Sequence, residues 1–194
     1  MSEKKAVIKA MVIMGSPRKN GNSATLARRV IDGLEEAGGE VESFYLHGMD
    51  IKPCTACDVC REQSSRDCII EDDMMGLYPK LRRADALVIA GPIYWFTVSA
   101  QTKLFLDRCY ALGGPQGNAL KGKRIGIVLT YADPDPFSSG AVNALRTFQD
   151  AFNYLGAPIV DMVYGTASKP GEIESNLELM SRAYQLGKDL AAES

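Results

Sequence analysis

A loop near the start of the chain combines the properties of a phosphate-binding site. An apolar run ends at Gly15, and a helical pattern begins near Ser23. The first amides of a helix have no partner within the helix, and the helix dipole favours an anion beside them. The side chains of this loop that could add hydrogen-bond donors or positive charge are Ser16, Arg18, Lys19, Asn20, Asn22 and Ser23.

The glycines of this loop exclude two common nucleotide sites. A P-loop ends in Gly-Lys-Ser or Gly-Lys-Thr, whereas this loop ends in Gly21-Asn22-Ser23 and lacks the lysine that contacts the β- and γ-phosphates. A dinucleotide fingerprint needs three glycines, and only Gly15 and Gly21 are present. The loop therefore predicts a cradle for a single phosphate group, such as that of a mononucleotide.

An aromatic cluster follows a later apolar run, in the loop from Gly91 to Val98. It contains the only tryptophan of the chain, Trp95, between Tyr94 and Phe96. A heteroaromatic ring could stack on these side chains and accept hydrogen bonds from the loop amides. Coverage of the core edge or a subunit contact is the alternative. We favour the cofactor because a phosphate loop is expected at the same edge of the sheet.

The cysteines have the spacing of a metal cluster. Cys54, Cys57 and Cys60 are separated by two residues each, and Cys68 follows after seven more. One short loop can then place three thiolates around a compact cluster, as in bacterial ferredoxins, whereas zinc sites more often use two separate knuckles. We expect a [4Fe–4S] cluster here, with bare thiols or a labile disulfide, and a zinc site, as alternatives. Cys109 is expected to be a buried, inert thiol.

Alternating strand and helix patterns would position these groups. Apolar runs predict strands at about Val7–Met14, Val41–Leu46, Ala86–Ala90, Arg124–Tyr131 and Ile159–Tyr164. Helical periodicity predicts helices at Ser23–Ala37, from Asp72, and at Ser99–Leu112, Ser139–Leu155 and Glu172–Ala191. Asn22 or Ser23 is expected to cap the first helix, and Gly38-Gly39 to end it.

This alternation predicts an α/β fold in a single domain, residues 1–194. Parallel strands covered by helices on both faces form a doubly wound sheet with right-handed crossovers. Ligands in that architecture bind at the carboxyl ends of the strands, so the loops after the first, third and fourth strands should meet at one site. Residues 47–71, which carry the cysteines, are long for a connection and are expected to form an insertion.

Two motifs give the chain a resemblance to the flavodoxin-like NAD(P)H-dependent flavin reductase family. They are Gly15–Ser23 and the segment that runs from Gly91-Pro-Ile-Tyr-Trp95 to Ser99-Ala-Gln-Thr-Lys-Leu-Phe-Leu-Asp-Arg108. The resemblance covers essentially the whole chain, and it implies a five-stranded parallel sheet of order 2-1-3-4-5 that binds FMN. It places the phosphate on Ser16, Arg18, Asn22 and Ser23, beside Asn20 and Gly21 of the same loop. It places the flavin ring on Pro92, Ile93, Tyr94, Trp95 and Phe96, with Tyr131 on the other side.

Among these reductases, the cysteine pattern is similar to that of the iron-sulfur flavoproteins, which bind a [4Fe–4S] cluster beside FMN. The resemblance implies Cys54, Cys57, Cys60 and Cys68 as the cluster ligands, and the seven-residue gap lies at the long end of the family pattern. No catalytic side chain is assigned, because flavin carries hydride and single-electron chemistry itself. His47, the only histidine, is assigned no role.

Three functions are consistent with these observations. The first is an FMN oxidoreductase with a cluster, which moves electrons between a reduced donor and an acceptor, the partner being a small molecule or a ferredoxin-type carrier. The second is a cluster-free NAD(P)H-dependent reductase of flavin or quinone. The third is a non-enzymatic thiol or zinc sensor. Because family members are commonly dimers or tetramers, the resemblance implies a homodimer or homotetramer.

Composition limits the partners and the location. The net charge is −2 and the pI is about 5.5, so there is no electrostatic case for binding nucleic acid or a membrane surface. No apolar run approaches the roughly 20 residues that span a bilayer. No signal peptide precedes the first strand, so we expect a cytoplasmic protein. In that compartment, cysteines are more often metal ligands, redox groups or buried thiols than structural disulfides.

Overall fold

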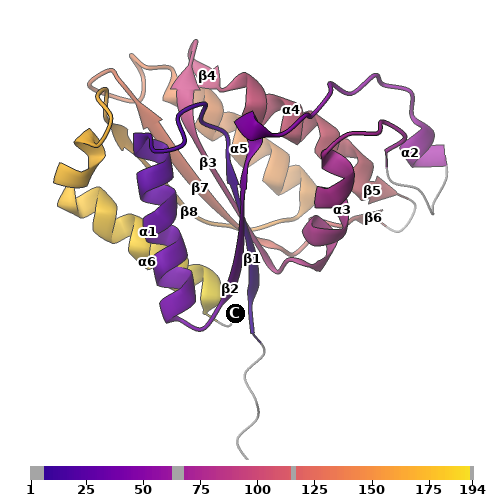
Figure 1. Ribbon diagram of the computed structural model, residues 1–194, viewed down its shortest axis with the longest axis horizontal. Coiled ribbons are helices and arrows are strands. Elements are labelled where there is room, and N and C mark those ends of the chain that lie inside the picture. Colours follow the sequence, from indigo (N-terminus) through magenta and orange to yellow (C-terminus); the bar gives the residue numbers. More distant parts are fainter. Residues whose placement is uncertain (1–6, 63–67, 115–116, 193–194) are drawn as a thin grey trace, which may run out of the picture.

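The computed structural model describes residues 7–62, 68–114 and 117–192. Its centre is a parallel sheet with the strand order β2-β1-β3-β7-β8, which confirms the predicted order (Figure 1). The strands are β2 (Glu40–Tyr45), β1 (Lys9–Met14), β3 (Ala86–Tyr94), β7 (Arg124–Tyr131) and β8 (Ile159–Thr166). A two-residue strand, β4 (Thr97–Val98), pairs antiparallel with the end of β3.

Helices cover both faces of this sheet, as the alternating pattern predicts. Their bounds are α1 (Asn22–Glu36), α3 (Met74–Arg83), α4 (Ala100–Arg108), α5 (Ala141–Leu155) and α6 (Leu177–Ala191). In Figure 1, α1 and α6 lie on one side of the sheet, and α3, α4 and α5 on the other. The molecule is therefore a three-layer α/β structure.

The alternation of strand side chains creates the two cores. In β1, Met11 and Ile13 face the core under α3, α4 and α5, whereas Ala10 and Val12 face the core under α1 and α6. The α1–α6 layer is tight because it meets at glycines. A Cβ on Gly33 would lie 2.1 Å from the carbonyl oxygen of Tyr184, so only glycine allows this approach.

Several predicted elements have different limits. The strand expected at Ala86–Ala90 continues to Tyr94, because β7 pairs with it as far as Pro92 and β4 pairs with its last two residues. The expected helix Ser99–Leu112 is α4 followed by the 3₁₀ helix η2 (Cys109–Leu112). The expected helix Glu172–Ala191 is the 3₁₀ helix η3 (Glu172–Ser175) followed by α6, which the side chain of Asn176 caps.

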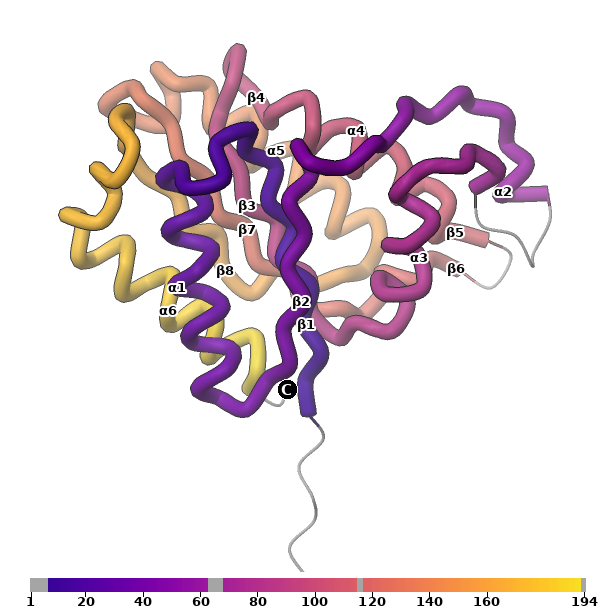
Figure 2. The backbone as a smooth tube through the Cα atoms, in the orientation of Figure 1, coloured from indigo at the N-terminus to yellow at the C-terminus, as the bar shows by residue number. Residues whose placement is uncertain are grey.

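The cysteine-bearing segment leaves the sheet after β2. It includes the 3₁₀ helix η1 (Leu46–Gly48) and the short helix α2 (Val59–Glu62), and residues 63–67 lie outside the described part. The two-residue strands β5 (Gly113–Gly114) and β6 (Gly117–Asn118) pair beside it. Figure 2 shows the segment running past α4 toward α2, on the side of the sheet away from α1.

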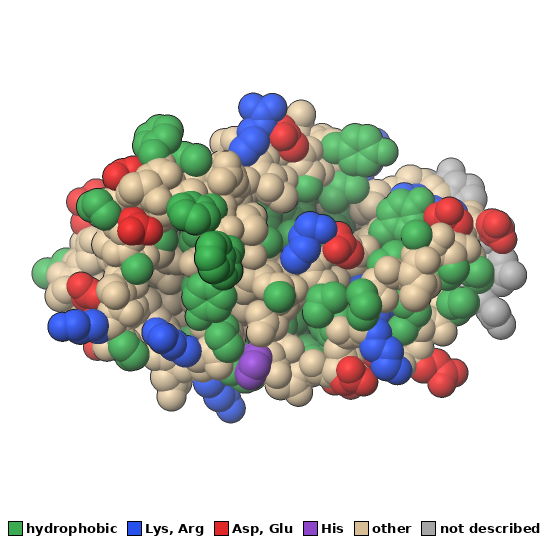
Figure 3. Space-filling view, turned by 90° about the horizontal axis from the view of Figure 1, so that it is seen from above, with side chains coloured by type: hydrophobic (Ala, Val, Ile, Leu, Met, Phe, Trp, Pro, Cys, Tyr) green, Lys and Arg blue, Asp and Glu red, His purple; other side chains and the backbone are tan. Residues whose placement is uncertain are grey.

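The carboxyl ends of β1, β3 and β7 lie together at the upper edge of the sheet. Met14 of β1 pairs with Ala90 of β3, and Pro92 of β3 pairs with Thr130 of β7. Figure 3 looks down on this edge and shows apolar side chains gathered between scattered charges. Among the described residues, none of the helices is long and apolar enough to span a membrane.

Candidate functional site

The phosphate-type loop joins β1 to α1 and leaves the helix start open. The first helical hydrogen bond runs from the amide of Thr25 to the carbonyl of Gly21, at 3.0 Å. The amides of Asn22, Ser23 and Ala24 therefore have no acceptor within the helix. Because the helix dipole adds positive potential at the same place, the loop has the chemistry of an anion site.

Helix α4 holds this loop in place through Gly15. The Ser99 hydroxyl donates to the Gly15 carbonyl at 2.7 Å, and the Gly15 amide donates to Ala90 O at 2.8 Å. A Cβ on Gly15 would lie 1.9 Å from Thr102 Oγ1, so the loop and α4 meet at a distance that only glycine permits. The sequence motif beginning at Ser99 thus fixes the position of the loop through the contacts of Ser99 and Thr102 with Gly15.

The predicted phosphate ligands lie at two depths. Ser16 and Ser23 are buried, while Arg18 and Asn20 are exposed at the rim. Ser16 Oγ accepts a hydrogen bond from the Arg18 amide at 3.0 Å, which curls the loop. Arg28, nearly two turns into α1, donates to Asn20 Oδ1 at 3.4 Å. Sequence reasoning missed Arg28, although helical spacing could have placed it within reach of the loop.

Asn22 has a different role from the one expected of its side chain. Its amide nitrogen donates to Ala167 O at 3.2 Å and Lys169 O at 2.9 Å, and its oxygen accepts from the Ile173 amide at 3.4 Å. The predicted cap is therefore wrong: the N-cap of α1 is Gly21, with no side-chain hydrogen bond. Asn22 fastens the loop after β8 to the phosphate loop, and its backbone amide is the donor left for an anion.

The aromatic residues form the tip of a hairpin rather than an open loop. Ile93 pairs with Val98 and Tyr94 with Thr97, which leaves Trp95 and Phe96 as a two-residue turn. Their φ angles are 48° and 63°, in the left-handed region. Asn-Gly is the usual pair at such a turn, and each bulky residue held there costs about 1 to 3 kcal/mol. Strain of this kind marks the tip as a candidate functional element.

The start of α5 supports the strained tip. Gly140 has φ of 72°, and a Cβ there would lie 2.4 Å from Cβ of Phe96. The Asn143 side chain donates to the Phe96 carbonyl at 3.1 Å. Trp95 remains 91% exposed, so its ring is free to contact a ligand or another protein.

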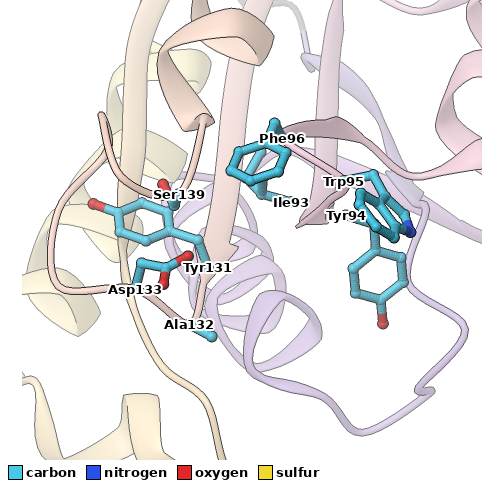
Figure 4. Close-up of a pocket in the computed structure, with 8 residues that line it drawn as sticks. All are labelled: Ile93, Tyr94, Trp95, Phe96, Tyr131, Ala132, Asp133 and Ser139. Carbon is cyan, nitrogen blue, oxygen red and sulfur yellow. The ribbon is translucent and has the colours of Figure 1, made fainter.

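An open groove of about 430 Å³ lies between this hairpin and the loop after β7 (Figure 4). Its walls are Ile93, Tyr94, Trp95, Phe96, Tyr131, Ala132, Asp133 and Ser139. The hairpin aromatics form one wall, and Tyr131 lies across from them beside Asp133 and Ser139. Burial raises the pKa of Tyr131, so its hydroxyl stays protonated and able to donate. A flat ring with polar edges fits this groove.

The four cysteines of the insertion line one small pocket. Cys54, Cys57, Cys60 and Cys68 all contribute to its wall, together with Tyr110. Ala56 and Asp58 have left-handed φ angles of 52° and 55°, which bend the backbone between the cysteines. The Ala56 amide lies 3.4 Å from Cys54 Sγ, within hydrogen-bond range of sulfur. The spacing of the cysteines thus brings their four thiols to a common cavity.

The thiols do not form a compact ligand set for one ion. Within residues 7–62, 68–114 and 117–192, no group of three or more His, Cys, Asp or Glu side chains is arranged to hold a metal ion. Burial, with the nearby Cys68 thiol, raises the pKa of Cys60. Arg61 lies with its guanidinium carbon 4.1 Å from the Tyr110 ring centroid and adds positive charge beside Cys60.

The two remaining residues of chemical interest lie apart from these pockets. Cys109 is 8% exposed, and burial raises its pKa to about 12, as expected for an inert thiol. His47 Nδ1 lies 3.1 Å from the side-chain nitrogen of Gln101 at the surface of α4. Neither residue lines the groove or the pocket of the four cysteines.

Comparison with known proteins points to one group. Residues 8–170 match the family model described as NADPH-dependent FMN reductase. An iron-sulfur flavoprotein of Methanocaldococcus jannaschii is 36% identical over 195 residues, covering 95% of this chain and 96% of the relative. An iron-sulfur flavoprotein of Archaeoglobus fulgidus is 32% identical over 187 residues, covering 95% of this chain and 79% of the relative.

A solved structure shows the same fold. The chain superposes on the NAD(P)H:quinone oxidoreductase from Methanothermobacter marburgensis with a TM-score of 0.78, covering 97% of this chain and 98% of that chain. The two sequences are 19% identical. At that identity the likeness concerns the arrangement of strands and helices alone.

Proposed function

The chain belongs to the NADPH-dependent FMN reductase family and is a flavin-dependent oxidoreductase, and from this we propose that it passes electrons between a reduced donor and an acceptor through FMN and a [4Fe–4S] cluster. The observation that carries the cluster is the convergence of Cys54, Cys57, Cys60 and Cys68 on one pocket. The names of the two iron-sulfur relatives support it.

The residues present fit FMN. The open amides at the start of α1 suit its phosphate, beside Ser16, Arg18, Asn20, Gly21, Asn22 and Ser23. The groove between the hairpin and Tyr131 suits its ring, with Ile93, Tyr94, Trp95 and Phe96 on the other side. Pro92, also predicted to line the ring, precedes them in β3 and is not part of the groove wall. Bound there, the flavin supplies hydride and single-electron transfer. The chain's own residues would bind the phosphate and orient the ring in the groove.

The four cysteines fit a cluster better than a single ion. A [4Fe–4S] cluster separates its ligand sulfurs more widely than one zinc ion does, because a cube of iron and sulfide lies between them. The four thiols line the wall of one pocket, as the four ligands of one cluster would. The amide of Ala56 beside Cys54 Sγ is a donor of the kind that tunes cluster potentials.

Anaerobic purification with iron, acid-labile sulfide and flavin assays tests this proposal. We expect about four iron and four sulfide per chain together with one FMN. A Cys57→Ala variant should lose iron and keep FMN, whereas Cys109→Ala, which removes a thiol outside the pocket, should keep both. FMN retained without iron in the wild-type protein would rule out the cluster.

A cluster-free NAD(P)H-dependent reductase of flavin or quinone is the second candidate. It is favoured by the lack of a compact metal-ligand group among the described residues. Turnover of NADPH with a quinone separates the two: a Cys54→Ala variant should slow if the cluster takes part and remain at the wild-type rate if it does not. Membership of an oxidoreductase family removes the third reading, a non-enzymatic thiol or zinc sensor.

The remaining expectations concern partners and assembly. We propose a small-molecule acceptor or a ferredoxin-type carrier as electron partner, and a homodimer or homotetramer as the assembled form in the cytoplasm. The net charge of −2 supports the expectation that nucleic acid is not a partner. Sedimentation of the purified holoprotein measures the assembly directly.

A further inference from the structure

A buried ion pair joins the two ends of the cysteine segment, the part of the chain from Lys52 to Asp72 that carries the four cysteines. We call the place where these two ends meet the base of the segment. Arg108, the last residue of α4, and Asp72, just before α3, both have fully buried side chains and contact each other. Arg108 Nη1 also donates to the carbonyl of Lys52 at 2.8 Å, and Nη2 lies 3.5 Å from the carbonyl of Ile70. One guanidinium therefore contacts the chain on both sides of the four cysteines.

Asp72 completes the closure. Its carboxylate accepts hydrogen bonds from the amides of Lys52 at 2.9 Å and Met74 at 3.0 Å. Burial alone would raise the pKa of Asp72, but the bonds from Arg108 and from the Lys52 amide outweigh burial and hold the pKa below its ordinary value. The carboxylate is thus charged at neutral pH. It connects Lys52, which precedes the four cysteines, to Met74, which follows them.

This pair suits positioning better than stability. A buried ion pair contributes little net stability, because removing both charges from water offsets their attraction. The planar fork of arginine, however, can bond two carbonyls and a carboxylate in one fixed geometry, which lysine or an apolar side chain cannot do. The Tyr78 hydroxyl adds a bond to the Arg108 carbonyl at 3.2 Å, so the residue is fixed at its backbone as well.

The other end of α4 is fixed to the phosphate loop. Ser99 caps the helix and donates to the Gly15 carbonyl at 2.7 Å, and Thr102 packs against Gly15. The nine residues of α4 span about 14 Å at the rise of an α-helix. A single short helix therefore joins the two sites, and Figure 1 shows it running from the hairpin toward the cysteine segment.

We propose that Arg108 is a positioning residue: with Asp72 it closes the base of the cysteine segment, and through α4 it holds that segment in a fixed place relative to the phosphate loop. The inference rests on the proposed function only for what the cysteines hold. If they hold a cluster, the Arg108–Asp72 pair fixes the separation between the cluster and the flavin.

Hydrogen exchange of the full-length, flavin-loaded protein tests the closure. A double variant, Arg108→Leu with Asp72→Leu, removes the pair without leaving one charge buried alone. We expect the amides of residues 53–62 to exchange about tenfold faster or more. The amides of residues 8–46 and the flavin content should stay at the wild-type values. Equal exchange in residues 53–62, or equal acceleration everywhere, would overturn the proposal.

Two further variants separate positioning from simple stability. Lys103→Ala removes an exposed cation of the same helix, paired with Asp107, and should leave exchange unchanged. Arg108→Lys keeps the charge but loses the fork, so exchange in residues 53–62 should still rise. If the double variant does not fold, Arg108→Lys decides the matter, and wild-type exchange in that variant refutes the role.

The cluster assay distinguishes failure of this inference from failure of the proposed function. The wild-type protein could hold no iron while residues 53–62 of the double variant still exchange faster. That result would refute the cluster and support the positioning role of Arg108. If the wild-type protein holds a cluster, the reduced cluster of the double variant should show an altered electron paramagnetic resonance spectrum. An unchanged spectrum together with unchanged exchange would refute the closure and leave the cluster in place.

Discussion

At the scale of single residues, the proposed flavin site depends on a missing side chain as much as on those present. Gly15 lets the phosphate loop rest on α4, because any Cβ there would meet Thr102 Oγ1 at 1.9 Å. Ser99 then fixes the carbonyl of the same residue. Small shifts at this contact would turn the loop amides away from a bound anion, so we expect Ser99 and Thr102 to affect affinity without touching the ligand.

A Gly15→Ala substitution should therefore weaken FMN binding by about tenfold or more, since the loop must move to avoid Thr102. Titration of the flavin-free protein with FMN measures the dissociation constant. Gly76→Ala is the matched control, because a Cβ at Gly76, inside α3, meets nothing within 4 Å. Unchanged FMN affinity in Gly15→Ala would show that the loop does not hold the phosphate.

Cys109 gives a pH-dependent prediction. Burial raises its pKa from 9.0 to about 12, so the unfolded chain loses this proton first as pH rises. Stability is thus fully present below pH 9 and falls as pH rises toward 12, by roughly 1 kcal/mol at pH 10. Urea unfolding at pH 8 and pH 10 should show a smaller loss for Cys109→Ala than for the wild-type protein. An equal loss in both would contradict the assignment.

At the scale of elements, the aromatic hairpin has a turn geometry that disfavours the bulky residues found in it. Its strands pair in the register of a tight two-residue turn, yet the turn residues are Trp95 and Phe96 rather than Asn and Gly. The packing of Gly140 and the hydrogen bond from Asn143 hold them in the left-handed conformation. The aromatic rings are thereby held at the groove, at a cost in stability.

Replacing Trp95→Asn and Phe96→Gly together should relieve that strain. We expect the free energy of unfolding of the flavin-free protein to rise by about 2 kcal/mol or more, while FMN binding weakens by about tenfold or more. Urea unfolding and FMN titration measure the two effects. Phe137→Ser, an exposed aromatic outside the hairpin, should change neither. A loss of stability in the double variant would refute the strain.

The elements also show what the sequence could reveal. Apolar runs located the central strands of the parallel sheet, because buried strands are nearly continuous in hydrophobicity, whereas the edge strand β2 is mostly exposed. The hairpin could not be predicted, since Trp95-Phe96 is not a turn pair and only packing against Gly140 allows it. The roles of Asn22 and Arg108 depend on partners far along the chain, such as Ala167 and Lys52, which local patterns do not contain.

At the scale of the whole molecule, the loop at the start of α1 and the groove proposed for the flavin ring join three strands at one edge of the sheet. The loops after β1, β3 and β7 meet there, and Asn22 ties the loop after β8 to them. A ligand that contacts these loops stabilises segments spread over the whole chain. The site should therefore affect the stability of the entire sheet rather than one loop.

Addition of FMN should raise the free energy of unfolding by about 2.7 kcal/mol when free FMN is 100 times its dissociation constant. Urea unfolding with and without ligand measures this increment. Riboflavin at the same concentration is the matched control, because it lacks the phosphate and should stabilise less. Equal stabilisation by the two ligands would show that the open amides at the start of α1 play no part.

The exposed hairpin tip also carries an intrinsic fluorescent probe of the site. Trp95 is the only tryptophan in the chain, and it lies at the groove proposed for the flavin ring. Its fluorescence reports from one known position, with no background from other indoles. Energy transfer to an adjacent flavin would quench this fluorescence, so its intensity would measure occupancy of the site. In the flavin-free protein, the emission wavelength would report how far water surrounds the Trp95 ring. Neither measurement needs a label.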